Sequence, residues 1–169
     1  MKKSGRKREE MGAWRLCERT KENVIVFYDR TEEKEIKKLF PKQASSLEEA
    51  LIQFQNTQKS NLSYGKTIYI GSRYIGDIWC YGIHQEKEVD AMLSYCIFEK
   101  EFWNRGIATE VVSAFLEEVI RRFALESIGA FTYSFNKASI RVLEKNNFQV
   151  QEIFLEDGVE SQYFIKKIK

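Results

Sequence analysis

Hydrophobic residues recur along the first third of the chain in patterns that predict one strand and three helices. Residues 14–17 are short and mixed enough to be a first strand. Residues 20–40 carry apolar side chains at helix-like spacing, which predicts two short helices; the positions are Val24, Phe27, Tyr28, Ile36, Leu39 and Phe40. Pro41 interrupts this pattern, and Ser45 then stands three residues before Glu48, the spacing of a capping box. The third helix is expected to carry Leu47, Ala50, Leu51 and Phe54 on one face.

The middle of the chain has the composition of β-strands. Three runs rich in Ile, Tyr and Trp, residues 66–71, 74–83 and 89–98, are separated by glycine and charged residues, which predicts an antiparallel meander. The third run is apolar at both of its alternating sets of positions. Because a strand with two apolar faces must be covered on both, we expect residues 89–98 to form a central strand.

The last third predicts two helices, a strand and a hairpin. Residues 109–123 have a charged face and an inward face made of Val111, Val112, Phe115, Val119 and Phe123. Residues 128–135 follow as a strand and residues 136–145 as a short helix, after which Asn147 suits the left-handed conformation that often closes a helix. Asp157-Gly158, between two apolar runs, is a strong hairpin signal.

Length and charge limit the classes of protein to which the chain can belong. With 169 residues and 43% hydrophobic residues, we expect a single domain over residues 11–169, preceded by a basic, disordered tail at residues 1–10. The 27 basic and 25 acidic residues nearly cancel to a net charge of +2, which argues against nucleic acid as the main partner. An adaptor that binds nucleic acid through the tail is the weaker reading.

Cysteine usage and hydropathy indicate a location inside the cell. Cys17, Cys80 and Cys96 are far apart and His84 is the single histidine, so neither a disulfide framework nor a metal site is predicted. No apolar run approaches the ~20 residues of a membrane span, and the N-terminus lacks the apolar core of a signal peptide. We therefore expect a cytoplasmic protein with no membrane partner.

The stretch "FWNRGIATE", residues 102–110, lies where a strand gives way to a helix. The first free N–H groups of a helix point at the preceding loop, and the macrodipole adds partial positive charge there. Gly106 lets a ligand approach the backbone, Ala108 keeps the next position small, and Arg105 adds a cation. These donors suit a pyrophosphate.

A second helix start lies about thirty residues further on. In "NKASIRVLEKNNF", Asn136 and Ser139 begin the helix that follows the next strand, so both helix starts are expected to face one ligand. Asn136 is also a good helix N-cap, and capping is compatible with ligand contact.

Together these two stretches resemble the GNAT-family N-acetyltransferases, and most closely the branch related to ribosomal-protein-alanine acetyltransferases. The family's glycine loop, Q/R-x-x-G-x-G/A, is matched at Gly106 and Ala108, with Trp103 in the first place. The branch's second signature, N-x-x-S-x-x-[VL]-L-E-K-x-G-F, is met by Asn136, Ser139, Val142, Leu143, Glu144, Lys145 and Phe148. Asn147 replaces its glycine and can take the same backbone shape. The resemblance is strong over residues 93–148 and weak elsewhere.

The resemblance implies a fold and a cofactor. The fold is α/β (α+β), with a mixed, mainly antiparallel central sheet flanked by helices and two splayed central strands, residues 91–98 and 128–135. The cofactor is acetyl-CoA, whose pyrophosphate would be held by the backbone N–H groups of Arg105, Gly106, Ile107, Ala108 and Thr109. The backbone of Ile97 and Phe98 would pair with the pantetheine arm, Asn136 would anchor it, and Ser139 would lie near the sulfur.

Two departures from the family pattern leave the catalytic groups open. Leu143 stands where many members carry a tyrosine acid, so Ser139 is the hydroxyl candidate. Met92 stands where many carry a glutamate base. Glu152 is our first candidate for a replacement, ahead of the carboxylates of Asp90 and Glu101. A covalent route through Cys96 is disfavoured, because no histidine is near it in sequence.

The missing base bears on the acceptor. A lysine amine has a pKa of ~10.4, whereas an α-amine at ~7.7–8.0 is already partly neutral at cellular pH. We therefore expect acetylation of a primary amine, most of all a protein N-terminal α-amine such as that of a ribosomal protein. A polyamine or aminoglycoside-type antibiotic is the alternative acceptor, and a non-catalytic acyl-CoA-binding module is the alternative class. A monomer and a homodimer are both open.

Overall fold

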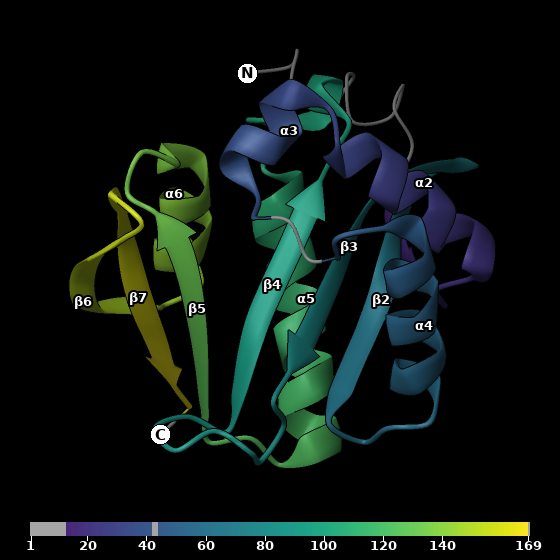
Figure 1. The fold of residues 1–169 in the computed structure, drawn as a ribbon. Coiled ribbons are helices and arrows are strands. Elements are labelled where there is room, and N and C mark those ends of the chain that lie inside the picture. Colours follow the sequence, from purple (N-terminus) through teal and green to yellow (C-terminus); the bar gives the residue numbers. More distant parts are fainter. Residues whose placement is uncertain (1–12, 42–43, 169) are drawn as a thin grey trace.

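The computed structural model describes residues 13–41 and 44–168, and it contains seven strands and five α-helices within these ranges. The elements are β1 (Trp14–Cys17), α2 (Lys21–Thr31), α3 (Lys34–Leu39), α4 (Leu47–Gln58), β2 (Ser63–Ile70), β3 (Arg73–Tyr81), β4 (Ala91–Ile97), α5 (Ile107–Phe123), β5 (Ser127–Tyr133), α6 (Lys137–Lys145), β6 (Gln149–Glu156) and β7 (Val159–Lys167), with a short 3₁₀ turn at Lys100–Phe102. Each predicted helix and strand is present (Figure 1). The predicted tail, residues 1–10, lies outside the described residues.

The strands form one sheet in the order β1-β2-β3-β4-β5-β7-β6. All neighbours are antiparallel except β4 and β5, which are parallel and paired only at Ala91 with Ile128 and at Met92 with Gly129. Beyond Met92 the two strands diverge, and the opening between them is visible at the centre of the sheet (Figure 1). The predicted mixed sheet with splayed central strands is therefore confirmed.

Strand β4 is covered on both faces, as its double apolar pattern predicted. Leu93 and Ile97 pack in the main core with α5, whereas Cys96 and Phe98 pack with Phe27 of α2 and other apolar residues on the opposite face. Helices thus pack on both faces of the central strand beside the opening.

Most of the predicted capping and turn residues are found in the structure. Asn147 has φ 67° and Asp157 has φ 51°, so the predicted left-handed residue after α6 and the predicted β6–β7 hairpin turn are confirmed. The predicted capping box of α4 was wrong by one residue. Ser46 caps the helix by accepting from the Glu49 N–H at 3.1 Å, while the Glu49 carboxylate accepts from the Ser45 N–H.

The physical reason for that error lies in the sequence Ser-Ser-Leu-Glu-Glu, which offers the same serine-to-glutamate spacing in two registers. The helix begins at Leu47, and this selects the later register. Among the described residues no helix is both long and apolar enough to cross a membrane.

Candidate functional site

The N-terminus of α5 presents a set of backbone donors. Gly106 is the N-cap residue with φ 80°, and no side chain caps the helix. The first intrahelical bond runs from the Glu110 N–H to the Gly106 carbonyl at 3.2 Å. The N–H groups of Ile107, Ala108 and Thr109 therefore have no partner within the helix, and they point toward the loop. They form the cluster of donors that the sequence predicted.

Gly106 is needed for its backbone conformation and leaves room above it. Its positive φ disfavours any residue with a Cβ, and a Cβ built there would meet nothing within 4 Å. Asn104, two residues earlier, is also left-handed with φ 58°. The loop thus turns sharply into α5 and leaves open space in front of the donors.

A cavity of about 570 Å³ extends from this helix start to the opening between β4 and β5. Eight of the nine residues predicted to bind the cofactor line it: Ile97, Arg105, Gly106, Ile107, Ala108, Thr109, Asn136 and Ser139. Phe98 is the exception. It is fully buried, and its N–H donates to the Ile75 carbonyl at 2.9 Å, so this N–H is not available to a ligand in the opening.

Two basic residues that were not among the predicted site residues also line the cavity. Arg141 and Lys145 lie one turn apart on α6 and border the same space as the α5 donors. Their spacing of four residues was a sequence signal, because such pairs share one face of a helix. The cavity therefore combines backbone donors with cationic side chains, which is the chemistry that binds phosphate groups.

A second space, an open groove of about 1330 Å³, meets the cavity in the opening of the sheet. The residues that line both spaces are Leu39, Phe40, Tyr95, Asn136 and Ser139. We call this set the junction. Leu39 and Phe40 close it from the end of α3, and the other three supply its polar groups.

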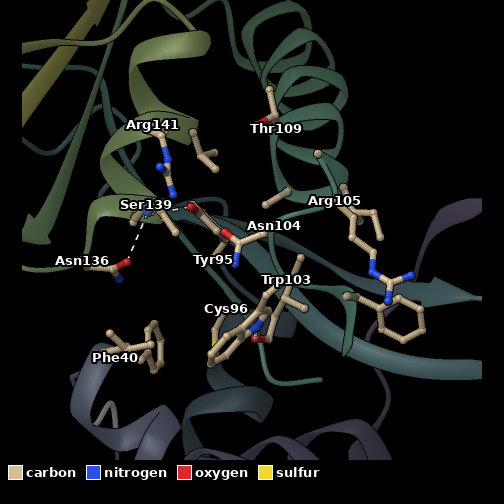
Figure 2. Close-up of a pocket in the computed structure, with 18 of the residues that line it drawn as sticks. Phe40, Tyr95, Cys96, Trp103, Asn104, Arg105, Thr109, Asn136, Ser139 and Arg141 are labelled. Carbon is tan, nitrogen blue, oxygen red and sulfur yellow. Dashed lines mark hydrogen bonds between the residues drawn. The ribbon is translucent and has the colours of Figure 1, made fainter. Parts of the chain in front are cut away.

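The polar groups of the junction are linked to each other. The Asn136 side chain accepts from the Ser139 N–H at 3.2 Å, so Asn136 is the N-cap of α6. The Tyr95 hydroxyl donates to the Ser139 hydroxyl oxygen at 3.3 Å. Figure 2 shows Asn136 joined to Ser139, with Tyr95 beside them and Phe40 across the space. Tyr95 is a third residue that was not among the predicted site residues, since its partner lies 44 residues away.

The groove contains the first candidate base and not the other two. Glu152 is an exposed residue of β6 that lines the groove together with Ser139. Asp90 instead accepts from the Glu126 N–H at 2.7 Å, and Glu101 is ion-paired with Arg73. Asp90 and Glu101 are therefore engaged in structural contacts, which leaves Glu152 as the candidate that faces the groove.

Carboxylates predominate among the charged residues of the groove. Its described lining contains Glu86, Glu88, Glu152, Glu156 and Asp157, against the single cation of Lys87. The near-neutral composition of the chain gave no sign of this local excess of negative charge. A cationic molecule would be attracted to the groove.

Three positions discussed from the sequence are apolar or inert in the structure. Met92 is buried at the groove and Leu143 is buried beneath it, so neither replaces the acid or base of the family pattern. Burial raises the pKa of the Cys96 thiol to about 12, so the cysteine that borders the cavity is not a thiolate at neutral pH. This disfavours a covalent acetyl-cysteine.

Comparisons with known proteins agree with this geometry. The family model of the acetyltransferase (GNAT) domain matches residues 14–149, which is most of the chain. A search of curated proteins finds no match.

Solved structures with the same fold share little sequence with this chain. The aminoglycoside acetyltransferase AAC(6')-Ib in complex with coenzyme A has a TM-score of 0.75 at 14% identity, over 92% of this chain and 95% of that one. The RimL ribosomal L7/L12 α-N-protein acetyltransferase in complex with coenzyme A has 0.75 at 15%, over 92% and 94%. The spermidine N-acetyltransferase from Vibrio cholerae in complex with CoA and spermine has 0.77 at 14%, over 94% and 96%. At these identities the likeness establishes the fold.

Proposed function

The chain belongs to the GNAT acetyltransferase family and is an N-acetyltransferase with acetyl-CoA as its acetyl donor, and we propose that its acceptor is the α-amine of a protein N-terminus. The observation that carries the proposal is Met92. This side chain lies on the central strand at the groove, where many members of the family have a carboxylate base. Because no carboxylate stands at this position of the central strand, an acceptor that is already partly neutral suits the site.

The negative charge of the groove strengthens this preference. Carboxylates near an ammonium group favour its charged form and raise its pKa. An amine that starts at ~10.4 then becomes harder to deprotonate, whereas an α-amine at ~7.7–8.0 still reaches its neutral form near physiological pH. The same charge attracts a basic polypeptide segment, such as the N-terminus of a ribosomal protein.

The cavity residues have proposed roles in binding the cofactor. The N–H groups from Arg105 to Thr109 bind the pyrophosphate, and the guanidinium of Arg141 contributes positive charge beside them. Ile97 lines the cavity, and its carbonyl already accepts from the Trp103 indole N–H at 2.7 Å, so we assign its backbone N–H to pairing with the pantetheine arm as an added strand would. Asn136 anchors that arm at the junction. Phe98 is given no contact with the cofactor, because its N–H donates to the Ile75 carbonyl. It packs behind the site.

Bound acetyl-CoA supplies a thioester carbonyl that is open to a nucleophile and a thiolate leaving group. We propose direct transfer, in which Glu152 accepts a proton from the attacking amine through groove water and Ser139 donates a hydrogen bond to the sulfur. The junction holds both substrates where the cavity and the groove meet, so the amine reaches the carbonyl without a covalent enzyme intermediate.

A second candidate acceptor is favoured by the carboxylates of the groove. A polyamine or aminoglycoside-type antibiotic carries several ammonium groups, and the five carboxylates of the groove could bind them simultaneously. Release of CoA from acetyl-CoA in the presence of each amine separates these acceptors from a peptide. It also separates an enzyme from a module that binds acyl-CoA without turnover.

The test uses one peptide in two forms at equal concentration. Both carry an internal lysine, but one has a free α-amine and the other an N-formyl group. We expect CoA release only with the free α-amine, and with a higher kcat/KM than for spermidine or an aminoglycoside. Acetylation of the lysine in the N-formyl peptide, or a preference for spermidine, would refute the α-amine proposal. Thermal melting with and without acetyl-CoA provides the binding control.

A further inference from the structure

Tyr95 and Ser139 form a hydroxyl pair at the centre of the junction. Tyr95 extends from β4, and its hydroxyl donates to the Ser139 oxygen at 3.3 Å (Figure 2). Ser139 lies in the first turn of α6, where its N–H is fixed by Asn136 at 3.2 Å. The serine is therefore held from two sides, by the strand and by the helix cap.

The pair lies where a leaving thiolate and an acceptor amine must meet. Both residues line the cavity and the groove, whereas the three other tyrosines of the groove, Tyr81, Tyr133 and Tyr163, line it without reaching the cavity. Leu143, at the position of the family's tyrosine acid, is 2% exposed and has no polar group. Tyr95 is thus the tyrosine with access to the junction.

We propose that Tyr95 is a positioning residue for Ser139: its O–H donates to the serine oxygen and turns the serine hydrogen toward the sulfur of the leaving group. Among the described residues the Ser139 hydroxyl hydrogen has no acceptor, because its bond with Tyr95 uses the serine oxygen, so the hydrogen can point into the cavity. The proposal rests on the acetyl transfer argued above, but it does not depend on which amine is the acceptor.

The chemical step balances without a proton from the pair. The amine nitrogen forms the new C–N bond, the C–S bond breaks, and its electron pair stays on sulfur as a thiolate. The nitrogen loses one proton to groove water. Ser139 stabilises the charge on sulfur by a hydrogen bond, and Tyr95 strengthens that bond because it donates to the same oxygen.

The environment of Tyr95 keeps it a donor. Burial raises the pKa of its phenol to about 12, with the hydrogen bond to Ser139 acting in the opposite direction. The phenol therefore keeps its proton at neutral pH and remains able to donate to Ser139.

A titration that needs no acceptor tests the pair. The thiol of CoA bound to the protein is titrated by the ultraviolet absorbance of its thiolate, in wild type, Tyr95→Phe, Ser139→Ala and the double variant. We expect Tyr95→Phe to reduce the thiol's acid dissociation constant about tenfold, which is about one pKa unit. Ser139→Ala should do at least as much, and the double variant should match Ser139→Ala. An unchanged constant in Tyr95→Phe, or additive effects, overturns the proposal.

Kinetics and a matched control complete the experiment. Tyr95→Phe should lower kcat about tenfold with unchanged KM values and an unchanged melting shift by acetyl-CoA. Tyr64→Phe, which removes a hydroxyl bonded to Glu118 away from the junction, should leave the titration unchanged. If wild type releases no CoA with any amine, the proposed acceptor chemistry fails. The titration still shows whether Tyr95 and Ser139 together stabilise the thiolate. A change in KM alone would show that Tyr95 acts on binding and would contradict its role at Ser139.

Discussion

The cavity and the groove, which we assign to the cofactor and to the acceptor, meet at one junction, yet they are built in different ways. The cavity takes its backbone donors from consecutive N–H groups at the start of α5, a feature contained in five residues of sequence, and Arg141 and Lys145 of α6 add positive charge. The groove takes its character from side chains of α3, β3, β4, β5, α6, β6, β7 and the loop before β4. A site made of backbone is local in the chain, whereas a site made of side chains exists only after the sheet has formed.

This difference fits the three neighbouring structures, which all contain coenzyme A but are named for different amine acceptors. Backbone donors at a glycine turn tolerate change in the surrounding side chains, so the same cofactor can be held at low sequence identity. Side chains that come from several elements can be replaced one at a time. The acceptor groove is therefore the half that individual substitutions can adapt to different amines.

The largest effect is expected where the backbone site is blocked. Gly106→Glu places a carboxylate in front of the α5 donors, where the phosphate belongs, and adds a Cβ at φ 80°. We expect acetyl-CoA affinity to fall by more than about a hundredfold, or about 2.7 kcal/mol at 25 °C. The measurement is the melting shift produced by acetyl-CoA, which should disappear in this variant.

Gly71→Glu is the matched control for that variant. Gly71 also has positive φ, 60°, and a Cβ there meets nothing within 4 Å, but it lies in the β2–β3 turn away from the cavity. It should carry the same backbone strain and the same added charge while retaining the melting shift. Equal shifts in the two variants would mean that the α5 start does not bind the cofactor.

The next largest effect is expected in the groove, which is built from side chains. Glu152→Gln removes the proposed base but keeps its shape, so kcat with an N-terminal peptide at pH 7 should fall about a hundredfold. The loss should shrink as pH rises toward the pKa of the α-amine, because the neutral amine then forms without help. Acetyl-CoA affinity should not change. The readout is the pH profile of kcat.

Glu156→Gln separates a base from a simple electrostatic effect. Glu156 lies on the same strand and lines the same groove. Its loss should raise KM for a cationic peptide and leave kcat near the wild-type value. If both variants lower kcat equally and by the same amount at every pH, Glu152 is one groove charge among others and not the base.

The same contrast between local and assembled features sets how much the sequence could predict. The α5 start, the Asn136 cap and the Asp157-Gly158 turn are local, and the structure contains all three. The Tyr95–Ser139 bond depends on how β4 and α6 pack together, which no spacing along the chain encodes. Phe98 was wrongly expected to contact the cofactor because the direction of its N–H cannot be read from the sequence. That direction depends on the register between neighbouring strands.

The acidic groove was hidden for a related reason. Glu86 and Glu88 precede β4, whereas Glu152 and Glu156 belong to β6, so the two pairs are separated by more than sixty residues of sequence. Overall charge is a sum over the whole surface and carries no information about such a local excess. Only the strand order, which places β6 and β7 beyond β5, brings the carboxylates to one space.

The smallest effect is expected in stability, on the face of the sheet that α2 covers. Asp77 is 2% exposed, accepts from the Tyr74 hydroxyl, and lies 2.9 Å from Arg19 as an ion pair. Burial raises the pKa of Asp77 to about 6 from 3.8, although Arg19 and Tyr74 act in the opposite direction. The folded state therefore holds this proton more tightly than the unfolded state.

Because of that raised pKa, the contribution of Asp77 to stability decreases as pH rises. Between pH 4.5 and pH 7 the ionisation of Asp77 should lower the free energy of unfolding by about 2 kcal/mol, and the Asp77→Asn protein should not show this decrease. Urea unfolding of both proteins at the two pH values gives the difference, with the other carboxylates common to both. Parallel pH dependence would mean that Arg19 compensates the buried charge fully. The Asp77–Arg19 pair would then contribute the same stability at both pH values, and this face of the sheet would be as insensitive to pH as the backbone donors of α5.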